Sequence, residues 1–408
     1  MKLKCGLIGE KLGHSFSPQI HEKLADYDYE LFEMSEAEVG PFLKNGDFHA
    51  INVTIPYKKT VMPFLDEITD EAKRIGAVNT ITRLPSGGLK GDNTDYYGFM
   101  YTVKKSGIHI SGRKVLVIGD GGASMTVRTV AADLGASEVV IITEEGNTPE
   151  NLMKHGDCGV LINATPVGMY PKTGVSAVIL DYFPKLEGVL DVIYNPAKTQ
   201  LLLDAEARGI PYSNGLPMLV AQAKAACERF IGGEVPDSEI DRITDEIERD
   251  TLNIILVGMP GVGKTTIGKK VAAKLGREFI DTDDVIVERA GRSIPEIFAS
   301  DGEAAFRKLE SQVVADVAKR SGLVIATGGG VPTIPANINP MRQNSVIFFL
   351  KRDITKLAKD GRPISQSRDL SELYAERLPK YRAVCDAEIE CTQNPAENCA
   401  MILQYLNK

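Results

Sequence analysis

The chain has 408 residues, of which 43% are hydrophobic and 25% are charged, an ordinary balance for a globular protein. Its formal net charge is −8 at pH 7 and it contains no tract of lysine and arginine, which argues against nucleic acid and anionic membranes as partners. No apolar run approaches the roughly 18 residues that span a bilayer, and the N-terminus lacks the apolar core of a signal peptide, so we expect a cytoplasmic protein.

Short strands and helices alternate over residues 1–101, where we expect a first α/β domain. Pro56 stops the strand before it, and Ser17 with Pro18 opens a helix. The predicted strands are residues 4–8, 51–56 and 77–81, and the predicted helix is 17–24.

Residues 102–235 have the pattern of a doubly wound, Rossmann-like domain. Continuous apolar strands are expected in a parallel sheet that is covered on both faces, and a glycine-rich turn follows the first of them. The predicted strands are 115–119, 138–142, 159–164 and 189–193, with helices at 123–134 and 216–231.

Residues 236–251 are the best candidate for a linker. Pro236 interrupts the chain and Ser238 can cap a helix. Isoleucines recur on one face of this helix and acids occupy the others, which is typical of a solvated connecting helix. A third domain with a parallel sheet then begins at residue 252, and its first strand is expected at 253–258.

Residues 258–265 read GMPGVGKT, which fits the phosphate-binding P-loop pattern between an apolar strand and a helix. The glycines let backbone amides approach phosphate, Lys264 can reach the β- and γ-phosphates, and the hydroxyl of Thr265 can bind Mg²⁺. The motif predicts nucleotide binding, and by itself it does not predict a kinase.

Acids and arginines downstream narrow the chemistry. The IDTDD run at 280–284 places carboxylates that can hold Mg²⁺ or accept a hydroxyl proton, although helix capping would also explain them. A single arginine is usually surface charge, whereas several that converge on a carboxylate or phosphate form a site. The candidates are Arg307, Arg362 and Arg377, together with the TGGG run at 327–330.

Residues 252–408 resemble shikimate kinase through GMPGVGKT, FIDTDD, AFRKLE, TGGGV, GRP and ERLPKYR. The resemblance implies ATP and Mg²⁺ as cofactors, with Thr265 and Asp281 at the metal and Asp283 deprotonating the 3-hydroxyl of shikimate. It implies further contacts from Gly258, Gly261, Val262, Gly263, Lys264 and Thr266 to ATP, from Arg307, Arg377, Gly328, Gly329 and Gly330 to shikimate, and from Arg362 in a lid to the transferring phosphoryl group. The lid segment is a few residues shorter than is usual in this family.

The first half of the chain contains a possible proton-transfer pair. Lys58 follows NVTIP and Asp95 lies in GDNTD, and such a pair can handle the proton when a ring alcohol is oxidised. A solvated lysine at a helix start and an aspartate N-cap explain the same residues equally well.

Residues 3–235 resemble shikimate dehydrogenase through GEKLGHSFSP, NVTIPYK, GAVNT, GDNTDYYG, INATPVGM, DVIYNPAKTQLL and NGLPMLVAQ, in that order. The resemblance implies that Lys58 and Asp95 are the catalytic pair and that 1–101 binds substrate. The implied substrate contacts are Ser15 and Ser17 at the shikimate carboxylate, Thr54, Asn79 and Asp95 at ring hydroxyls, and Tyr194 and Gln222 in the cleft.

The nicotinamide site departs from this family. The usual GAGGASR is GDGGASM here, so Asp120 adds a negative charge where pyrophosphate approaches a helix N-terminus. Glu144 stands where the family uses arginine for the 2′-phosphate of NADP, and an acid there suits the ribose hydroxyl of NAD. The other expected contacts are Gly119, Gly121, Gly122, Ala123, Asn163, Thr165 and Gly215. Two hypotheses follow: the domain uses NAD in place of NADP, or cofactor binding has decayed.

We therefore expect a bifunctional enzyme that reduces 3-dehydroshikimate with NADPH or NADH and phosphorylates shikimate with ATP, with small molecules as its partners. The alternative is a shikimate kinase that carries a substrate-binding, redox-impaired first half.

Overall fold

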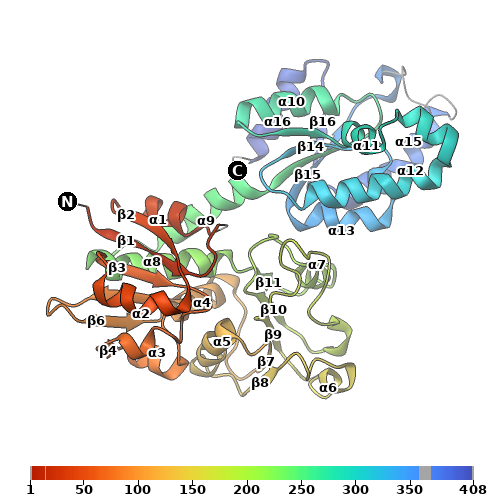
Figure 1. Cartoon of the computed structure of the whole chain (residues 1–408). Coiled ribbons are helices and arrows are strands. Elements are labelled where there is room, and N and C mark those ends of the chain that lie inside the picture. The colour runs from red at the N-terminus through yellow and green to blue at the C-terminus, as the bar shows by residue number, and fades with distance from the viewer. Residues whose placement is uncertain (1, 14, 358–368, 407–408) are drawn as a thin grey trace. The chain divides into compact units, whose positions relative to one another are not determined.

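The computed structural model describes residues 2–13, 15–357 and 369–406. The chain divides into two compact units (Figure 1). The first consists of Met1–Gly168, Val175–Tyr194 and Asp204–Glu246, and the second of Met169–Gly174, Asn195–Leu203 and Ile247–Lys408. The predicted α/β architecture is confirmed in both. In the described part of the chain, no helix is long and apolar enough to cross a membrane.

The first unit opens with a six-stranded mixed sheet in the order β2-β1-β3-β5-β6-β4. Here β1 pairs in parallel with β2 and β3, whereas β5 pairs antiparallel with β3 and β6. The elements are β1 (Lys4–Gly9), α1 (Ser17–Leu24), β2 (Asp28–Glu33), α2 (Glu36–Asn45), β3 (Ala50–Val53), η1 (Met62–Phe64), β4 (Glu67–Ile68), α3 (Asp70–Ile75), β5 (Thr80–Arg83) and β6 (Leu89–Asp92). The predicted strand at 51–56 ends at Val53, since the chain turns out of the sheet before Pro56.

A second sheet in this unit has five parallel strands in the order β11-β10-β9-β7-β8. The strand order reverses at β7, and ligands of such sheets bind beyond the carboxyl ends of the strands at the reversal. The elements are α4 (Thr94–Ser106), β7 (Lys114–Ile118), α5 (Gly122–Asp133), β8 (Glu138–Ile142), α6 (Pro149–Met153), β9 (Val160–Asn163), η2 (Leu180–Tyr182), β10 (Gly188–Asp191), α7 (Gln200–Ala207), β11 (Tyr212–Ser213) and α8 (Leu216–Ile231).

The expected connecting helix forms as α9 (Ser238–Thr251), but its apolar face is buried and not solvated. Ile240 and Ile243 are fully buried, and Lys23 of α1 forms an ion pair with Glu246 at 2.8 Å. The sequence shows that this helix has an apolar stripe, whereas the partner that covers the stripe comes from residues far away in the chain. The domain boundaries drawn at 101, 235 and 251 stay predictions.

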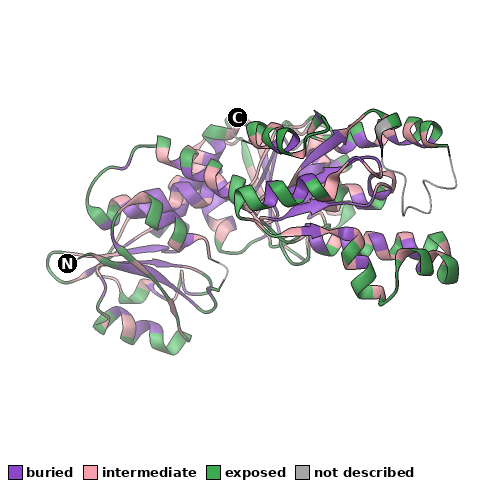
Figure 2. Cartoon of the chain, turned by 90° about the horizontal axis from the view of Figure 1, so that it is seen from above, coloured by how far each residue is buried: buried purple, intermediate pink, exposed green. Residues whose placement is uncertain are grey.

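The second unit contains five parallel strands in the order β13-β14-β12-β15-β16. Its elements are β12 (Asn253–Val257), α10 (Lys264–Leu275), β13 (Phe279–Asp281), α11 (Thr282–Ala290), α12 (Ile294–Ala318), β14 (Val324–Ala326), η3 (Val331–Thr333), α13 (Pro335–Gln343), β15 (Ser345–Lys351), η4 (Ile354–Lys356), α15 (Leu370–Val384), β16 (Ala387–Glu390) and α16 (Pro395–Leu406). Buried strands lie among helices with exposed outer faces (Figure 2). In a parallel sheet of this kind, ligands bind at the loops that follow the carboxyl ends of the strands, so a site is expected there.

Candidate active sites

Lys58 and Asp95 form an ion pair in the first unit. The ammonium Nζ of Lys58 lies 2.6 Å from Oδ2 of Asp95, and the two side chains are 20% and 12% exposed. Lys58 follows β3, and Asp95 lies in the first turn of α4. The N-cap of α4 is Asn93, so the alternative of Asp95 as an N-cap is wrong. The pair is sheltered enough to strengthen its electrostatics and open enough to meet a ligand.

A buried polar network holds Asn79 behind this pair. Its Oδ1 accepts the amide N–H of Thr94 at 2.7 Å and the hydroxyl of Thr80 at 3.0 Å. Asn52 donates from Nδ2 to the carbonyl oxygen of Asn79 and to Oγ1 of Thr80. Sequence reasoning missed Asn52, although a polar residue inside an otherwise apolar strand was a usable signal.

The predicted carboxylate contacts lie at the start of α1. Ser17 is the first residue of this helix, and its amide donates to Oγ of Ser15 at 3.2 Å. A helix N-terminus favours an anion, because its amides point outward and its dipole is positive there. Phe16, between the two serines, makes an edge-to-face contact with Tyr194 at 5.6 Å between ring centroids, and burial raises the pKa of Tyr194.

Two other predicted substrate residues form hydrogen bonds with carbonyl groups of the backbone. Thr54 is half-buried directly after β3, and its amide donates to the carbonyl of Ile8 at 3.0 Å. Gln222 lies on α8 and donates from Nε2 to the carbonyl of Leu219 at 3.0 Å. No hydrogen bond is recorded between Gln222 and the other predicted substrate residues in the described part of the chain.

The glycine-rich turn after β7 combines a tightly packed start with an open end. Gly119 has φ of 100°, and a Cβ there would lie 2.7 Å from Cγ2 of Thr165, so the turn packs tightly on the end of β9. A Cβ on Gly121 or Gly122 would meet nothing within 4 Å. The N-terminus of α5, where Ala123 is the second residue, is therefore open to a phosphate group.

Two predicted cofactor contacts have structural roles. Asn163 is fully buried; its Nδ2 donates to Asp191 at 3.0 Å, and its Oδ1 accepts the Thr165 hydroxyl at 2.7 Å. A Cβ on Gly215 would lie 2.0 Å from the carbonyl oxygen of Val192, so only glycine fits there.

Acidic side chains surround this turn. Asp120 follows Gly119, and Glu144 follows β8; both are exposed, and no ion pair is recorded for either among the described residues. Only a five-residue helix, α6, is described between β8 and β9, in agreement with the short sequence there. The local charge at the expected phosphate positions is therefore negative.

The P-loop of the second unit curls around its own lysine. Gly258, Gly261 and Gly263 have φ of 146°, 87° and 107°, a region that favours glycine. Lys264 donates from Nζ to the carbonyl oxygens of Gly258 at 2.9 Å and Met259 at 3.1 Å. Val262 is buried, whereas Thr266 is exposed. This cradle fits a triphosphate, whose oxygens would replace the carbonyls as partners of the lysine.

Thr265 and Asp281 meet at the edge of the same loop. The Thr265 hydroxyl donates to Oδ2 of Asp281 at 2.7 Å, and Oδ1 of Asp281 accepts the amide of Asp283 at 3.1 Å. No group of three or more His, Cys, Asp or Glu in the described ranges could hold a metal. This donor set fits Mg²⁺, which typically takes one or two protein oxygens and completes its shell with phosphate and water.

The glycine triplet after β14 allows charged side chains to approach the backbone. A Cβ on Gly328 would lie 2.9 Å from Oδ1 of Asp283, and one on Gly330 would lie 2.3 Å from Nη1 of Arg307. A Cβ on Gly329 would lie 3.3 Å from Nη1 of Arg377. The predicted carboxylate and two predicted arginines therefore converge on one loop, whereas Arg362 lies outside the described residues.

Burial, followed by the nearby charge of Asp281, raises the pKa of Asp283 to about 6. A carboxyl group with such a pKa can accept a proton near neutral pH. Arg377 is 5% exposed, so its charge is also held in a sheltered environment. These features are typical of acid–base sites.

Glu310 is a member of this cluster that sequence reasoning missed. It is 1% exposed, and its Oε2 lies 2.8 Å from Nη1 of Arg307, which is one helical turn earlier on α12. Burial raises the pKa of Glu310, while Arg307 opposes this rise. The three-residue spacing in AFRKLE was the available signal. Glu310 fixes the direction in which Arg307 points.

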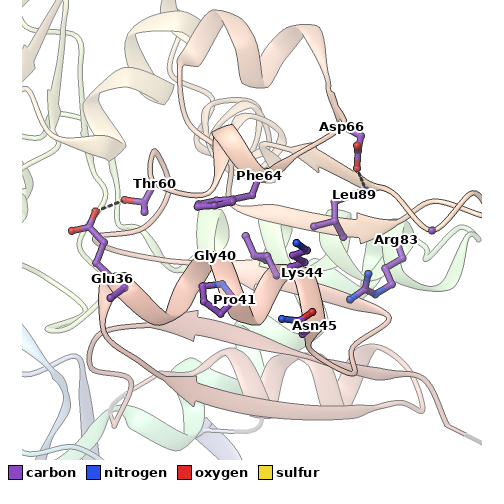
Figure 3. Close-up of a pocket in the computed structure, with 13 residues that line it drawn as sticks. Glu36, Gly40, Pro41, Lys44, Asn45, Thr60, Phe64, Asp66, Arg83 and Leu89 are labelled. Carbon is purple, nitrogen blue, oxygen red and sulfur yellow. Dashed lines mark hydrogen bonds between the residues drawn. The ribbon is translucent and has the colours of Figure 1, made fainter.

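A groove of about 870 Å³ lies elsewhere, between α2, η1 and the β5–β6 hairpin (Figure 3). Phe64 covers the α2 side, where a Cβ on Gly40 would lie 2.7 Å from its ring. Lys44 of α2 and Arg83 of β5 also line the groove. None of the predicted site residues lines this groove, so it is separate from both candidate sites.

Comparisons with known proteins find relatives for both halves of the chain. Residues 7–81 match the shikimate dehydrogenase substrate binding domain, and residues 260–407 match shikimate kinase. A shikimate dehydrogenase (NADP(+)) from Clostridium perfringens (strain SM101 / Type A) is 38% identical over 265 residues, which are 60% of this chain and 97% of that protein.

Solved structures resemble the same part of the chain. A chorismate mutase/shikimate 5-dehydrogenase fusion protein from Clostridium acetobutylicum is 36% identical with a TM-score of 0.56, covering 60% of this chain and 97% of its own. Shikimate 5-dehydrogenase from Listeria monocytogenes, solved in complex with shikimate and NAD, is 30% identical with a TM-score of 0.53, covering 59% and 96%.

Proposed function

The chain belongs to the shikimate dehydrogenase family and carries a shikimate kinase domain C-terminal to it, and from this premise we propose two sequential reactions. The first unit reduces 3-dehydroshikimate to shikimate. The second transfers the γ-phosphoryl group of ATP to the 3-hydroxyl of shikimate. The product of the first reaction is thus the substrate of the second.

The Lys58–Asp95 contact of 2.6 Å is the observation that supports the first reaction most directly. Reduction of a ring ketone needs a hydride at carbon and a proton at oxygen, and the nicotinamide cofactor supplies the hydride when bound. Lys58 donates the proton to the developing alkoxide, while Asp95 orients the ammonium and accepts a ring hydroxyl. In the reverse direction Lys58 takes the proton back.

The other substrate contacts orient the ring. Ser15 and Ser17 bind the carboxylate at the N-terminus of α1, where the helix dipole favours an anion. The Oδ1 atom of Asn79 accepts a hydrogen bond from the amide of Thr94 within the fold. The Nδ2 group of Asn79 therefore donates to a ring hydroxyl of the substrate. Phe16 and Tyr194 cover the carboxylate end and exclude water.

The nicotinamide cofactor binds at the turn between Gly119 and Gly122. We propose that the acid at Glu144 favours NAD over NADP, because a carboxylate accepts hydrogen bonds from a ribose hydroxyl and repels a 2′-phosphate. The second hypothesis, decayed cofactor binding, is favoured by the exposed carboxylate of Asp120 beside the N-terminus of α5.

The cluster around Gly328–Gly330 supports the second reaction. Asp283 accepts the proton of the 3-hydroxyl, and its pKa of about 6 leaves it ionised at neutral pH. Arg307 and Arg377 bind the shikimate carboxylate. Lys264 neutralises the phosphates, and Thr265 with Asp281 would hold Mg²⁺, which supplies charge stabilisation when bound.

Two substitutions in the full chain test this assignment. Lys58→Ala should lower the rate of shikimate oxidation by about 10²–10⁴-fold, since general acid–base catalysis contributes that much, and should leave phosphorylation unchanged. Lys264→Ala should lower phosphorylation by about 10²–10³-fold and leave oxidation unchanged. Steady-state assays with NAD, NADP and ATP measure both.

Each outcome separates the hypotheses. Oxidation that survives Lys58→Ala would show that the proton-transfer pair is wrongly assigned. If the unmodified chain phosphorylates shikimate but oxidises it with neither cofactor, the bifunctional hypothesis fails and the redox-impaired alternative holds.

A further inference from the structure

The start of α9 and Asp237 just before it contact the two helices that carry predicted dehydrogenase residues. Asp95 lies in the first turn of α4, and Gln222 lies in the middle of α8. Ile240 and Ile243 of α9 are completely buried, and Tyr101 of α4 donates its hydroxyl to Asp241 of α9 at 2.7 Å. All of these residues belong to the first unit.

Lys224 on α8 is a buried cation at the centre of this packing. Its side chain is 7% exposed, and its Nζ lies 2.8 Å from Glu228 and 2.9 Å from Asp237. The ammonium also lies 5.3 Å from the ring centroid of Tyr97. A buried ammonium is tolerated only with such partners, and Glu228 together with Asp237, just before α9, compensates its charge.

Asp237 also reaches the other helix. The hydroxyl of Tyr97, two residues after Asp95, donates to Oδ1 of Asp237 at 2.8 Å. Hydrogen bonds from Lys224 and Tyr97 lower the pKa of Asp237, so its carboxylate stays charged. The carboxylate of Asp237, which lies in the predicted linker, therefore bonds to side chains of both α4 and α8. We call Tyr97, Lys224 and Asp237 together the clamp.

The clamp lies beside a close approach of the two helices. A Cβ on Gly98 would lie 2.6 Å from the carbonyl oxygen of Met218 and 3.0 Å from Cβ of Gln222. Gly98 is three residues after Asp95 on the same helix, so it lies one turn from the ion pair with Lys58. The position of Gln222 relative to Asp95 is thus set at this contact.

We propose that Tyr97, Lys224 and Asp237 are positioning residues for dehydrogenation: they hold the first turn of α4 on α8, so that Asp95 keeps its contact with Lys58 and Gln222 keeps its place beside that turn. This inference rests on the proposed dehydrogenase function. It also implies that residues 236–246 contribute to dehydrogenase activity.

Matched variants of the full chain test the proposal. Tyr97→Phe and Tyr101→Phe each remove one phenol hydroxyl that donates to an aspartate at or before α9, but only Tyr97 belongs to the clamp. Tyr97→Phe and Lys224→Met should lower kcat for shikimate oxidation by about tenfold, because small displacements of a reacting group cost that much or more. The control Tyr101→Phe and the rescue variant Lys224→Arg should stay within about twofold.

Three further readouts separate positioning from general destabilisation. The KM for the nicotinamide cofactor and the kcat of phosphorylation by the same chain should not change. Equal losses in Tyr97→Phe and Tyr101→Phe, or a parallel loss of phosphorylation, would overturn the proposal. Hydrogen exchange of residues 94–98 should accelerate in Lys224→Met.

The exchange measurement does not depend on turnover. If the unmodified chain fails to oxidise shikimate, the proposed function falls, and the clamp is judged by exchange alone. Unchanged exchange at 94–98 in Lys224→Met would then overturn it.

Discussion

The two glycine-rich turns of this chain have the same backbone plan and opposite charge. Gly119–Gly122 follows β7 and leads into α5, and Gly258–Gly263 follows β12 and leads into α10. Both end at a helix N-terminus, which favours an anion. Lys264 adds a positive charge to one turn, whereas Asp120 adds a negative charge to the other. We therefore expect the backbone to set where a phosphate would bind and the side chains to set which phosphate compound would be accepted.

Carboxylates differ between the two halves in the same way. At the dehydrogenase turn, Asp120 and Glu144 face water. At the kinase site, Asp283 and Glu310 are sheltered, and the charges of Lys264 and Arg307 lie close to them. Sheltered carboxylates change their pKa and can move protons, whereas exposed ones act mainly by attraction or repulsion of a ligand.

Reversal of the charge at Glu144 should make the first turn more like the second. In Glu144→Arg the ratio of kcat/KM with NADP to that with NAD should rise by about 100-fold, because a repulsion of the 2′-phosphate becomes an attraction. Steady-state oxidation of shikimate with each cofactor measures the ratio. Glu145→Arg is the matched control, and an equal rise there would contradict a specific role of Glu144.

The raised pKa of Asp283 predicts that the rate of phosphorylation depends on pH. Asp283 has a pKa of about 6, so phosphorylation should fall by about tenfold between pH 7 and pH 5 as this group gains its proton. Because its pKa is raised in the folded chain, protonation of Asp283 stabilises the fold, and unfolding through this group does not explain the loss. A rate of phosphorylation that is flat from pH 7 to pH 5 would contradict the assignment.

Removal of the charge at Asp120 should have the smallest effect. Asp120→Asn should raise kcat/KM for both nicotinamide cofactors by about two- to fivefold, as expected for one charge near a helix N-terminus. Glu150→Gln, an exposed acid in the first turn of α6, serves as the control. A decrease in Asp120→Asn would show that this carboxylate contributes to binding.

The sequence predicted those parts of the fold that depend on local pattern. The helix Leu216–Ile231 was predicted to the residue, and the strands predicted in the two parallel sheets lie within a few residues of β7, β8, β9, β10 and β12, since apolar runs and glycine turns are local signals. The strand at 28–33 was missed because none of its residues is fully buried, so its pattern of apolar and polar residues is weak. The burial of α9 was missed because the residues that contact it come from α1 and α4, far away in the sequence.

The candidate sites followed the same division. Lys264, Thr265 and Asp281 stand in two short motifs: Lys264 donates to Gly258 within its own loop, and Thr265 contacts Asp281 of the second motif. Glu310 was missed because its role depends on its contact with the Gly328–Gly330 loop, which follows β14 and lies elsewhere in the sequence. Asn163 was predicted to contact the cofactor, yet its hydrogen bonds are used within the fold. A motif identifies which residue type is needed and does not show what that residue already binds.

Incubation of the full chain with 3-dehydroshikimate, ATP, Mg²⁺ and either NADH or NADPH tests the central claim most directly. We expect shikimate 3-phosphate to accumulate, with Lys58→Ala blocking the first step and Lys264→Ala leaving shikimate as the end product. Mass spectrometry of the products distinguishes these results. A chain that phosphorylates added shikimate but never consumes 3-dehydroshikimate with either cofactor would contradict a bifunctional enzyme.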